Sequence, residues 1–386
     1  MHLVSVIIPT YNQAEYLATA LESIFAQTYP LLEVIVVNDG CIDKTPSILQ
    51  AYEPRIRVIE QENRGLPAAR NRGFLASHGH YVYFLDSDDQ AHPDFIQTLV
   101  NLLDHHPEYG LAYSAWKQID SNGFTLNEIH PNRKGNLLEA ILTREIFFFS
   151  SMSIMQREWL QKVNLYDESL HWSDDADLWL RLASSGCQFG YIDQPLVNYR
   201  IHRESMSGQV KPVQIDDWHR VLDRFFANPT LPTEIQRLRG KAYAVLNFET
   251  AGRYFRSGDI EHGQEQLRQA LSKQPQIEPD WFLNWLAGTA LDGRTVHPIQ
   301  YINRVFDHLI PEMNHLKPLR TRALGQYHLA AAFSAFHGNQ PRKVLRHAIP
   351  AAVLNPGSLS NNGFISILLK SIFAHFKDPK KIERDR

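Results

Sequence analysis

The N-terminal part of this chain alternates short apolar runs with segments of helical periodicity. Four runs have strand character, at residues 3–9, 32–38, 56–60 and 81–86, and they are rich in Val and Ile without alternating polar residues. Strands of this composition are typically buried on both faces, as in parallel sheets covered by helices. We therefore predict an α/β fold with a mostly parallel sheet flanked by helices.

The segment after the first strand has the pattern of an amphipathic helix. Asn12 is a candidate N-cap with Glu15 three residues later, and Leu17, Leu21 and Ile24 follow at helical spacing. We expect this apolar face to pack on the sheet.

Composition excludes several classes of protein. The 386 residues carry a formal net charge of −3, which gives no general attraction to nucleic acid. Two cysteines make neither a disulfide framework nor a CxxC metal pattern. The N-terminus lacks a signal-peptide pattern, and no apolar run approaches the roughly 20 residues needed to span a bilayer. We therefore expect a cytoplasmic protein, with peripheral contact at the inner membrane face left open.

The sequence becomes rich in helical patterns beyond about residue 210. We predict three parts: residues 1–210 form the α/β domain, 211–236 a linker, and 237–386 an all-α C-terminal domain. Tyr254, Gly258, Ala270 and Pro275 are spaced as in a tetratricopeptide unit, and Ala351 and Pro356 suggest a weaker second copy. Plain helical hairpins explain the pattern equally well.

Three acids lie at the end of the strand predicted at residues 81–86: Asp86, Asp88 and Asp89. Neighbouring carboxylates repel one another unless they are solvated or share a cation. Oxygen ligands suit Mg²⁺ or Mn²⁺, and Mg²⁺ commonly reaches substrate phosphates through one or two carboxylates. The alternative is a solvated turn, since turns are rich in Asp.

Asp39 ends the second predicted strand within the segment VVNDG. Its carboxylate can accept a hydrogen bond from N3–H of uracil or thymine, or it can belong to an ordinary Asp-Gly turn. Neither GxGxxG nor GxxxxGK[ST] occurs near the first strand, so a nucleotide needs another mode of binding.

A set of segments in fixed order resembles the family 2 glycosyltransferases with the GT-A fold. The likeness covers about residues 3–207 and rests on VSVIIPTYNQAEYLATALESIFAQTYP, EVIVVNDGCIDKT, NRGLPAARNRG, YVYFLDSDD, YDES, DDADLWLRLA and YRIHRESMS. The resemblance implies an inverting, metal-dependent enzyme that moves a sugar from a nucleotide diphosphate sugar, most often a UDP-sugar, to an acceptor hydroxyl. The metal would be Mn²⁺ or Mg²⁺.

The resemblance also implies roles for individual residues. The nucleoside pocket would be lined by Pro9, Thr10 and Tyr11, with Asp39 pairing with the base and Arg70 near the base or phosphates. Asp86 and Asp88 would approach the ribose and the metal. The metal ligands would be Asp88, Asp89 and His202, and the general base would be Asp175.

The spacing around Asp175 supports its role independently. In a helix, Asp175 shares a face with Leu178, Trp179 and Leu182, where a carboxylate is costly unless it is paired or functional. Asp174 is better explained as a first-turn acid favoured by the helix dipole.

The sequence also allows two other functions. One is a catalytically silent nucleotide-sugar-binding or scaffold protein that recruits protein partners through its helical domain. The other is a nucleotidyltransferase, which is disfavoured because a basic Gly-rich loop near the first strand is missing. The acceptor is undetermined: a saccharide, a lipid-linked saccharide and a protein all fit.

The C-terminal segment GFISILLKSIFAHFKDPKKIERDR allows two interpretations. Ile365, Leu368, Ile372 and Phe376 would lie on one helical face with lysines beyond. This pattern fits an interfacial membrane helix, but we favour a terminal helix packed on the helical domain.

Overall fold

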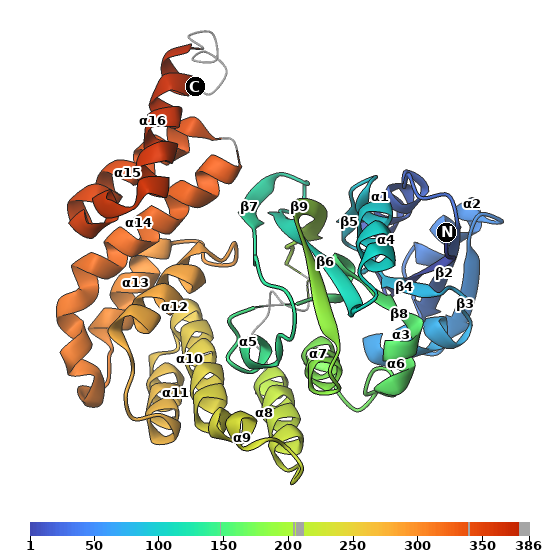
Figure 1. Ribbon diagram of the computed structural model, residues 1–386, viewed down its shortest axis with the longest axis horizontal. Helices are drawn as coiled ribbons and strands as arrows, with labels where there is room; N and C mark the ends of the chain where they lie inside the picture. The colour runs from blue at the N-terminus through green and yellow to red at the C-terminus, as the bar shows by residue number, and fades with distance from the viewer. Residues whose placement is uncertain (147, 204, 206–211, 339, 378–386) are drawn as a thin grey trace. The chain divides into compact units, whose positions relative to one another are not determined.

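The computed structural model describes residues 1–146, 148–203, 205, 212–338 and 340–377 (Figure 1). The chain divides into two compact units. The first comprises Met1–Phe124 and Ile129–Ala242, and the second comprises Thr125–Glu128 and the chain from Tyr243 onward. The boundary expected at residue 210 falls outside the described residues. The stretch expected as a linker contains the helices α8 (Pro212–Phe226) and α9 (Thr233–Arg237), both in the first unit.

A mixed sheet forms the centre of the first unit, with strand order β3-β2-β1-β4-β8-β6-β9-β5. The strands β1 (Val4–Thr10), β2 (Leu32–Asp39), β3 (Arg57–Gln61) and β4 (Tyr81–Phe84) are parallel to their neighbours in this group. β8 (Ser153–Gln156) pairs antiparallel with β4 and with β6 (Tyr109–Ile119), and β6 pairs parallel with β9 (Gln188–Arg200). The short β5 (Gln90–Ala91) is antiparallel to β9. The predicted fold class is confirmed.

Strand register brings the candidate acids to one edge of the sheet. Thr10 at the end of β1 lies opposite Asn38 in β2, and Asp39 lies opposite Gln61 in β3. The loops after β1, β2 and β4 therefore meet at the carboxyl edge, where parallel sheets bind ligands.

Helices cover the faces of this sheet (Figure 1). They include α1 (Ala14–Phe25), α2 (Thr45–Tyr52), α3 (Leu66–Leu75), α4 (Phe95–His105), α5 (Leu138–Leu142), α6 (Arg157–Lys162) and α7 (Asp174–Ser184). As predicted, Leu17, Leu21 and Ile24 of α1 are buried. Helix α3 packs on β1 and β2 at Gly73, where an added Cβ would lie 2.3 Å from Cγ2 of Ile7.

The N-cap predicted for α1 is wrong. Asn12 has a φ of +53°, and the helix begins two residues later at Ala14. The Asn12 side chain accepts a hydrogen bond from the backbone N–H of Ile42 instead. The N–H of Ala14 donates to Asp43, so a carboxylate from the loop after β2 satisfies the start of α1.

In the described residues of the second unit, the secondary structure is helical apart from residues 125–128, which belong to β7 (Thr125–Ile129). The helices of this unit are α10 (Arg239–Ser257), α11 (Ile260–Lys273), α12 (Pro279–Leu291), α13 (Pro298–Asp307), α14 (Arg320–His337), α15 (Pro341–Leu354) and α16 (Asn362–Lys377). Helix α10 begins in the first unit and continues into the second. One apolar cluster includes Phe248, Phe255, Phe282 and Phe306, and another joins α14, α15 and α16. Gly258, with a φ of +89°, makes the turn between α10 and α11. Membership of the tetratricopeptide family stays a hypothesis.

None of the described helices combines the length and the apolar character that crossing a bilayer requires.

Candidate active site

Arg70 is the centre of a buried charge network at the carboxyl edge. This α3 residue is 1% exposed, and its Nη2 lies 2.7 Å from Asp86 at the end of β4. Its Nη1 lies 2.7 Å from Asp174 and 3.1 Å from Asp175, the first two residues of α7. One guanidinium thus joins the acid that follows β4 to the N-terminus of a helix more than 80 residues later.

A single guanidinium leaves this set of three carboxylates with excess negative charge. Burial raises the pKa of Asp86 to about 6, and the Asp175 and Asp88 carboxylates add to the rise against the opposing effect of Arg70. Burial likewise raises the pKa of Asp174 to about 7, again opposed by Arg70. The network therefore favours the uptake of a proton or another cation.

Asp175 is held through one of its two carboxylate oxygens. Oδ1 accepts hydrogen bonds from Arg70 and, at 2.5 Å, from the hydroxyl of Ser150. Ser150 in turn lies 2.6 Å from the Tyr166 hydroxyl, and the Tyr166 ring lies beside Arg70. Within the described part of the chain, no hydrogen bond engages Oδ2. This arrangement fixes the carboxyl group and leaves one oxygen for a ligand.

The two acids at the start of α7 are in different environments. The Asp174 side chain is 6% exposed, whereas that of Asp175 is 22% exposed. Interpreting Asp174 as an ordinary dipole-favoured acid was therefore incomplete, because it is also buried against Arg70. Leu178, Trp179 and Leu182 are buried on the face expected to carry Asp175.

Asp88 and His202 lie in contact although they are 114 residues apart in the sequence. His202 Nε2 lies 3.0 Å from Asp88, and the His202 ring packs against Tyr16 of α1. The Arg200 guanidinium donates to the backbone carbonyl of Asp88, which fixes the loop. An imidazole and a carboxylate at this spacing are groups that bind divalent cations.

Asp89, the next residue along the chain, is almost fully buried. Its Oδ1 accepts the backbone N–H of Arg200, while its buried Oδ2 has no hydrogen-bond partner within the described residues. Burial, with the charges of Asp88 and Asp86, raises its pKa well above the usual range. Among the described residues, no group of three or more His, Cys, Asp or Glu side chains is arranged around one metal position. The Asp88–His202 pair supplies two groups of the kind that bind divalent cations, and the buried Asp89 oxygen is not arranged with them around one position.

The residues expected to bind the nucleoside differ in accessibility. Pro9 and Thr10 are buried in β1, whereas Tyr11 is exposed. Asp39 accepts hydrogen bonds from Gln61 and from the backbone of Arg64 and Gly65. A carboxylate has about four acceptor positions, so Asp39 retains capacity for one further donor.

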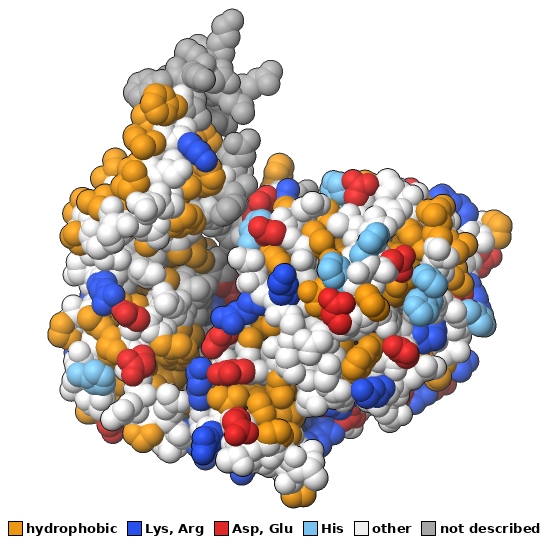
Figure 2. Space-filling view, viewed as in Figure 1, with side chains coloured by type: hydrophobic (Ala, Val, Ile, Leu, Met, Phe, Trp, Pro, Cys, Tyr) orange, Lys and Arg blue, Asp and Glu red, His pale blue; other side chains and the backbone are white. Residues whose placement is uncertain are grey.

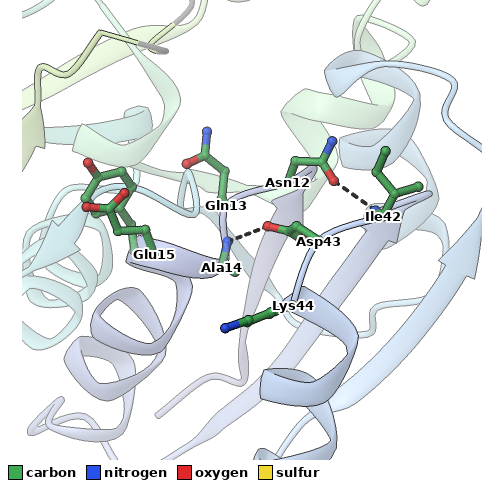
Figure 3. A pocket seen from close by; sticks show the side chains of 8 residues that line it. Asn12, Gln13, Ala14, Glu15, Ile42, Asp43 and Lys44 are labelled. Carbon is green, nitrogen blue, oxygen red and sulfur yellow. Dashed lines mark hydrogen bonds between the residues drawn. The ribbon is translucent and has the colours of Figure 1, made fainter.

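A pocket adjoins these strand ends, between the loops after β1 and β2 (Figure 3). Its lining comprises residues 12–16 and 42–44. Hydrogen bonds from Ile42 to Asn12 and from Ala14 to Asp43 tie the two loops together along its wall. The pocket begins next to Tyr11, but neither Asp39 nor the Arg70 network lines it.

Sequence reasoning missed Ser150 and gave no role to Tyr166. Ser150 lies within the run FFFSSMSI, which has no motif to distinguish it from the adjacent serines. Tyr166 belongs to YDES, which was recognised only as part of the ordered set of segments. Asn71, the neighbour of Arg70, exchanges hydrogen bonds with the Tyr166 backbone and thereby connects two of those segments.

Comparisons with known proteins agree with this architecture. The family described as Glycosyl transferase family 2 matches residues 5–163. A Rickettsia prowazekii (strain Madrid E) protein named as an uncharacterized glycosyltransferase is 32% identical over 256 residues, covering 64% of this chain and 78% of that protein. A glycosyltransferase of Rickettsia bellii (strain RML369-C) is 31% identical, and the chain spans 36% of its length.

Two solved structures share the fold. S. aureus TarS 1–349 in complex with UDP-GlcNAc has a TM-score of 0.53 at 20% identity, covering 84% of this chain and 88% of that chain. The mannosyltransferase PcManGT of Pyrobaculum calidifontis, in complex with GDP-Man and Mn²⁺, has a TM-score of 0.52 at 18% identity, covering 84% and 87%. The Rickettsia prowazekii relative and the family match over residues 5–163 show that the chain belongs to glycosyltransferase family 2.

Proposed function

We propose that this protein transfers a sugar from a nucleotide diphosphate sugar, preferably a UDP-sugar, to an acceptor hydroxyl with inversion at the anomeric carbon. One observation carries the proposal: Arg70 joins the acid segment after β4 directly to Asp175. The side chains of Asp86, Asp88 and Asp175 are each between 21% and 23% exposed, whereas Arg70 beneath them is sealed. A donor and an acceptor would thus be able to reach the carboxylates of Asp86, Asp88 and Asp175. The buried guanidinium of Arg70 would hold Asp86 and Asp175 in position.

Asp175 is the proposed general base. Its Oδ2 would accept the proton of the acceptor hydroxyl, while Ser150 and Arg70 restrain Oδ1. The hydroxyl oxygen would then form a bond to the anomeric carbon as the bond from that carbon to the diphosphate breaks. Attack from the face opposite the diphosphate inverts the configuration.

The donor end of the site is proposed at Asp88 and His202. These side chains, with Asp89 below them, would hold a divalent cation that neutralises charge on the departing diphosphate. A nitrogen ligand favours Mn²⁺ over Mg²⁺. Asp39 would accept N3–H of uracil at its remaining acceptor position. TarS with UDP-GlcNAc and PcManGT with GDP-Man and Mn²⁺ support a donor of this class.

The substitution Asp175→Asn tests the proposed base. We expect transfer to fall roughly 10²- to 10⁴-fold, because the amide cannot accept the proton, while donor affinity stays within a few-fold. Transfer would be followed with UDP-sugars and a panel of acceptors, with Mn²⁺ or with EDTA, and NMR would assign the product anomer. Binding would be measured by thermal shift, since a ligand of the folded state raises the melting temperature.

Asp177→Asn is the matched control on the same helix, because Asp177 pairs with Arg181 one turn along and does not contact Arg70. Near-normal transfer by Asp175→Asn would reject Asp175 as the base. A retained anomeric configuration would reject inversion, and full activity in EDTA would reject metal dependence.

A further inference from the structure

The C-terminal helices carry an unusual charge pattern in a chain whose net charge is −3. From Met313 to Lys377 the sequence contains no Asp or Glu. The same segment contains eight basic residues: Lys317, Arg320, Arg322, Arg342, Lys343, Arg346, Lys370 and Lys377. Such a segment repels cations and attracts an anionic surface.

Helix α15 divides into a buried face and an exposed face. Val344, Ala348 and Ala351 are buried in the cluster shared with α14 and α16. Arg342, Arg346, Ile349 and Val353 recur at intervals of three or four residues, which places them on one exposed side. Ile349 is 67% exposed and Val353 is 70% exposed. Basic and large apolar side chains therefore share this side of α15.

Helix α16 packs against α15 and repeats the pattern. Phe364 and Ile367 are buried, whereas Leu369 is 50% exposed and Phe373 is 65% exposed, with exposed Lys370 between them. The sequence had suggested an apolar face at Ile365, Leu368 and Ile372, but those side chains are only partly exposed. The side chain of Phe376, also in that prediction, lies outside the described residues.

We call this set the apolar–basic surface: Arg342, Lys343, Arg346, Ile349, Val353, Leu369, Lys370 and Phe373. On the face seen in Figure 2, hydrophobic side chains gather over α15 and α16, with no acidic side chain among them. Large exposed apolar side chains that cluster on a protein usually mark an interaction site.

We propose that the apolar–basic surface docks on a membrane rich in anionic lipid headgroups. Ile349, Val353, Leu369 and Phe373 would enter the boundary between headgroups and acyl chains, and the neighbouring Lys and Arg would contact lipid phosphates. A second copy of the chain is a poor occupant, because two acid-free surfaces would bring like charges together. A protein partner fits less well because Lys is depleted in protein interfaces. The proposal does not depend on the proposed catalytic residues.

Sedimentation of the full chain with lipid vesicles tests the proposal. The probes are vesicles of phosphatidylcholine alone and vesicles containing phosphatidylglycerol, at low and high NaCl. We expect binding to the anionic vesicles, weakening as salt rises because the phosphate contacts are screened. Failure to bind anionic vesicles, or equal binding to both kinds, would overturn the proposal.

Two double substitutions separate the apolar and basic contributions. We expect Leu369→Ser with Phe373→Ser, and Lys343→Glu with Arg346→Glu, each to weaken binding by on the order of tenfold or more. All four side chains are exposed, so circular dichroism and melting should be unchanged. Val296→Ser with Leu75→Ser is the matched control, since these side chains are 80% and 71% exposed elsewhere.

If both double variants bind anionic vesicles as well as the control variant does, the apolar–basic surface is not the docking site. If the wild-type chain instead dimerises with rising concentration and Leu369→Ser with Phe373→Ser abolishes the dimer, the surface is a protein interface and the membrane proposal fails.

Discussion

Carboxylates are concentrated at the loop edge of the sheet, whereas helices α14 to α16 contain none. At the loop edge, Asp86, Asp174 and Asp175 share the buried guanidinium of Arg70. In the C-terminal helices, apolar contacts around Val344 and Phe364 supply the core. One region thus depends on compensation of buried charge and the other on apolar burial. Substitutions and changes of pH should therefore affect them differently.

The largest loss of stability and activity is expected when Arg70 is substituted. Arg70→Met leaves three carboxylates with no cationic partner, so we expect a loss of about 3–5 kcal/mol in unfolding free energy and no detectable transfer. Arg64→Met removes an exposed ion pair with Glu168 and should cost less than about 1 kcal/mol. Urea unfolding of the full chain, followed by circular dichroism, measures both. If the two variants cost the same, the Arg70 network does not stabilise the unit. Arg70→Lys provides a milder variant should Arg70→Met not fold.

Glycine-to-alanine substitutions should change the unfolding free energy in opposite directions in the two units. Gly73 has no room for a methyl group against Ile7, so Gly73→Ala should destabilise by about 1–3 kcal/mol. Gly288 in α12 is exposed and has no heavy atom within 4 Å of an added Cβ, so Gly288→Ala should stabilise by about 0.4–1 kcal/mol. Thermal melts show whether each variant melts above or below the wild-type protein. Stabilisation by Gly73→Ala would contradict the tight contact between α3 and β1.

Substitution of Ser150 tests how the carboxyl group of Asp175 is positioned within the site. Ser150→Ala removes a hydrogen bond to Asp175 Oδ1, and we expect kcat to fall roughly tenfold, about 1.4 kcal/mol, while KM for the donor stays constant. Tyr166→Phe removes only the hydroxyl that contacts Ser150 and should have a smaller effect. Steady-state kinetics separate kcat from KM. A rise in KM with normal kcat would show that Ser150 serves donor binding instead of positioning the base.

Changes of pH should alter the stability of the two units with opposite slopes. Burial raises the pKa of Asp174 to about 7 from 3.8, so between pH 4 and 7 the folded state binds the extra proton and this contribution to stability falls as pH rises. Burial and the charge of His328 lower the pKa of His347 in α15 to about 4 from 6.5. In that window the unfolded state binds the extra proton, so stability rises with pH. In melts from pH 4 to 7, Asp174→Asn and His347→Gln should each weaken one slope relative to wild type. Part of the first slope should remain, because burial also raises the pKa of Asp86 to about 6. Matching slopes would contradict these assignments.

The sequence predicted the fold well because strands that are buried on both faces have a recognisable local composition, rich in Val and Ile. The runs at residues 3–9, 32–38, 56–60 and 81–86 correspond to β1, β2, β3 and β4. Asp88 and His202 were named together from the resemblance, and their side chains lie in contact. The metal-binding, nucleoside-binding and catalytic roles of the predicted site residues stay predictions.

Contacts between distant residues were harder to predict. Ser150 reaches Asp175 across 25 positions, and no local pattern distinguishes it from Ser151. Asp43 satisfies the start of α1 from another loop, which made the local cap pattern at Asn12 misleading. The exposed residues of α16 depend on how that helix rotates against α14 and α15, which periodicity alone does not fix.

The alternation of strands and helices and the acids at the strand ends could be read from the amino-acid sequence. The carboxyl ends of parallel strands share one edge of the sheet, so these acids were expected to lie near one another. Which of these acids are buried and which are accessible depends on packing, since α3 brings Arg70 against the first residues of α7. Asp174 and Asp175 are neighbours in sequence, yet packing buries one and leaves an oxygen of the other available to a ligand.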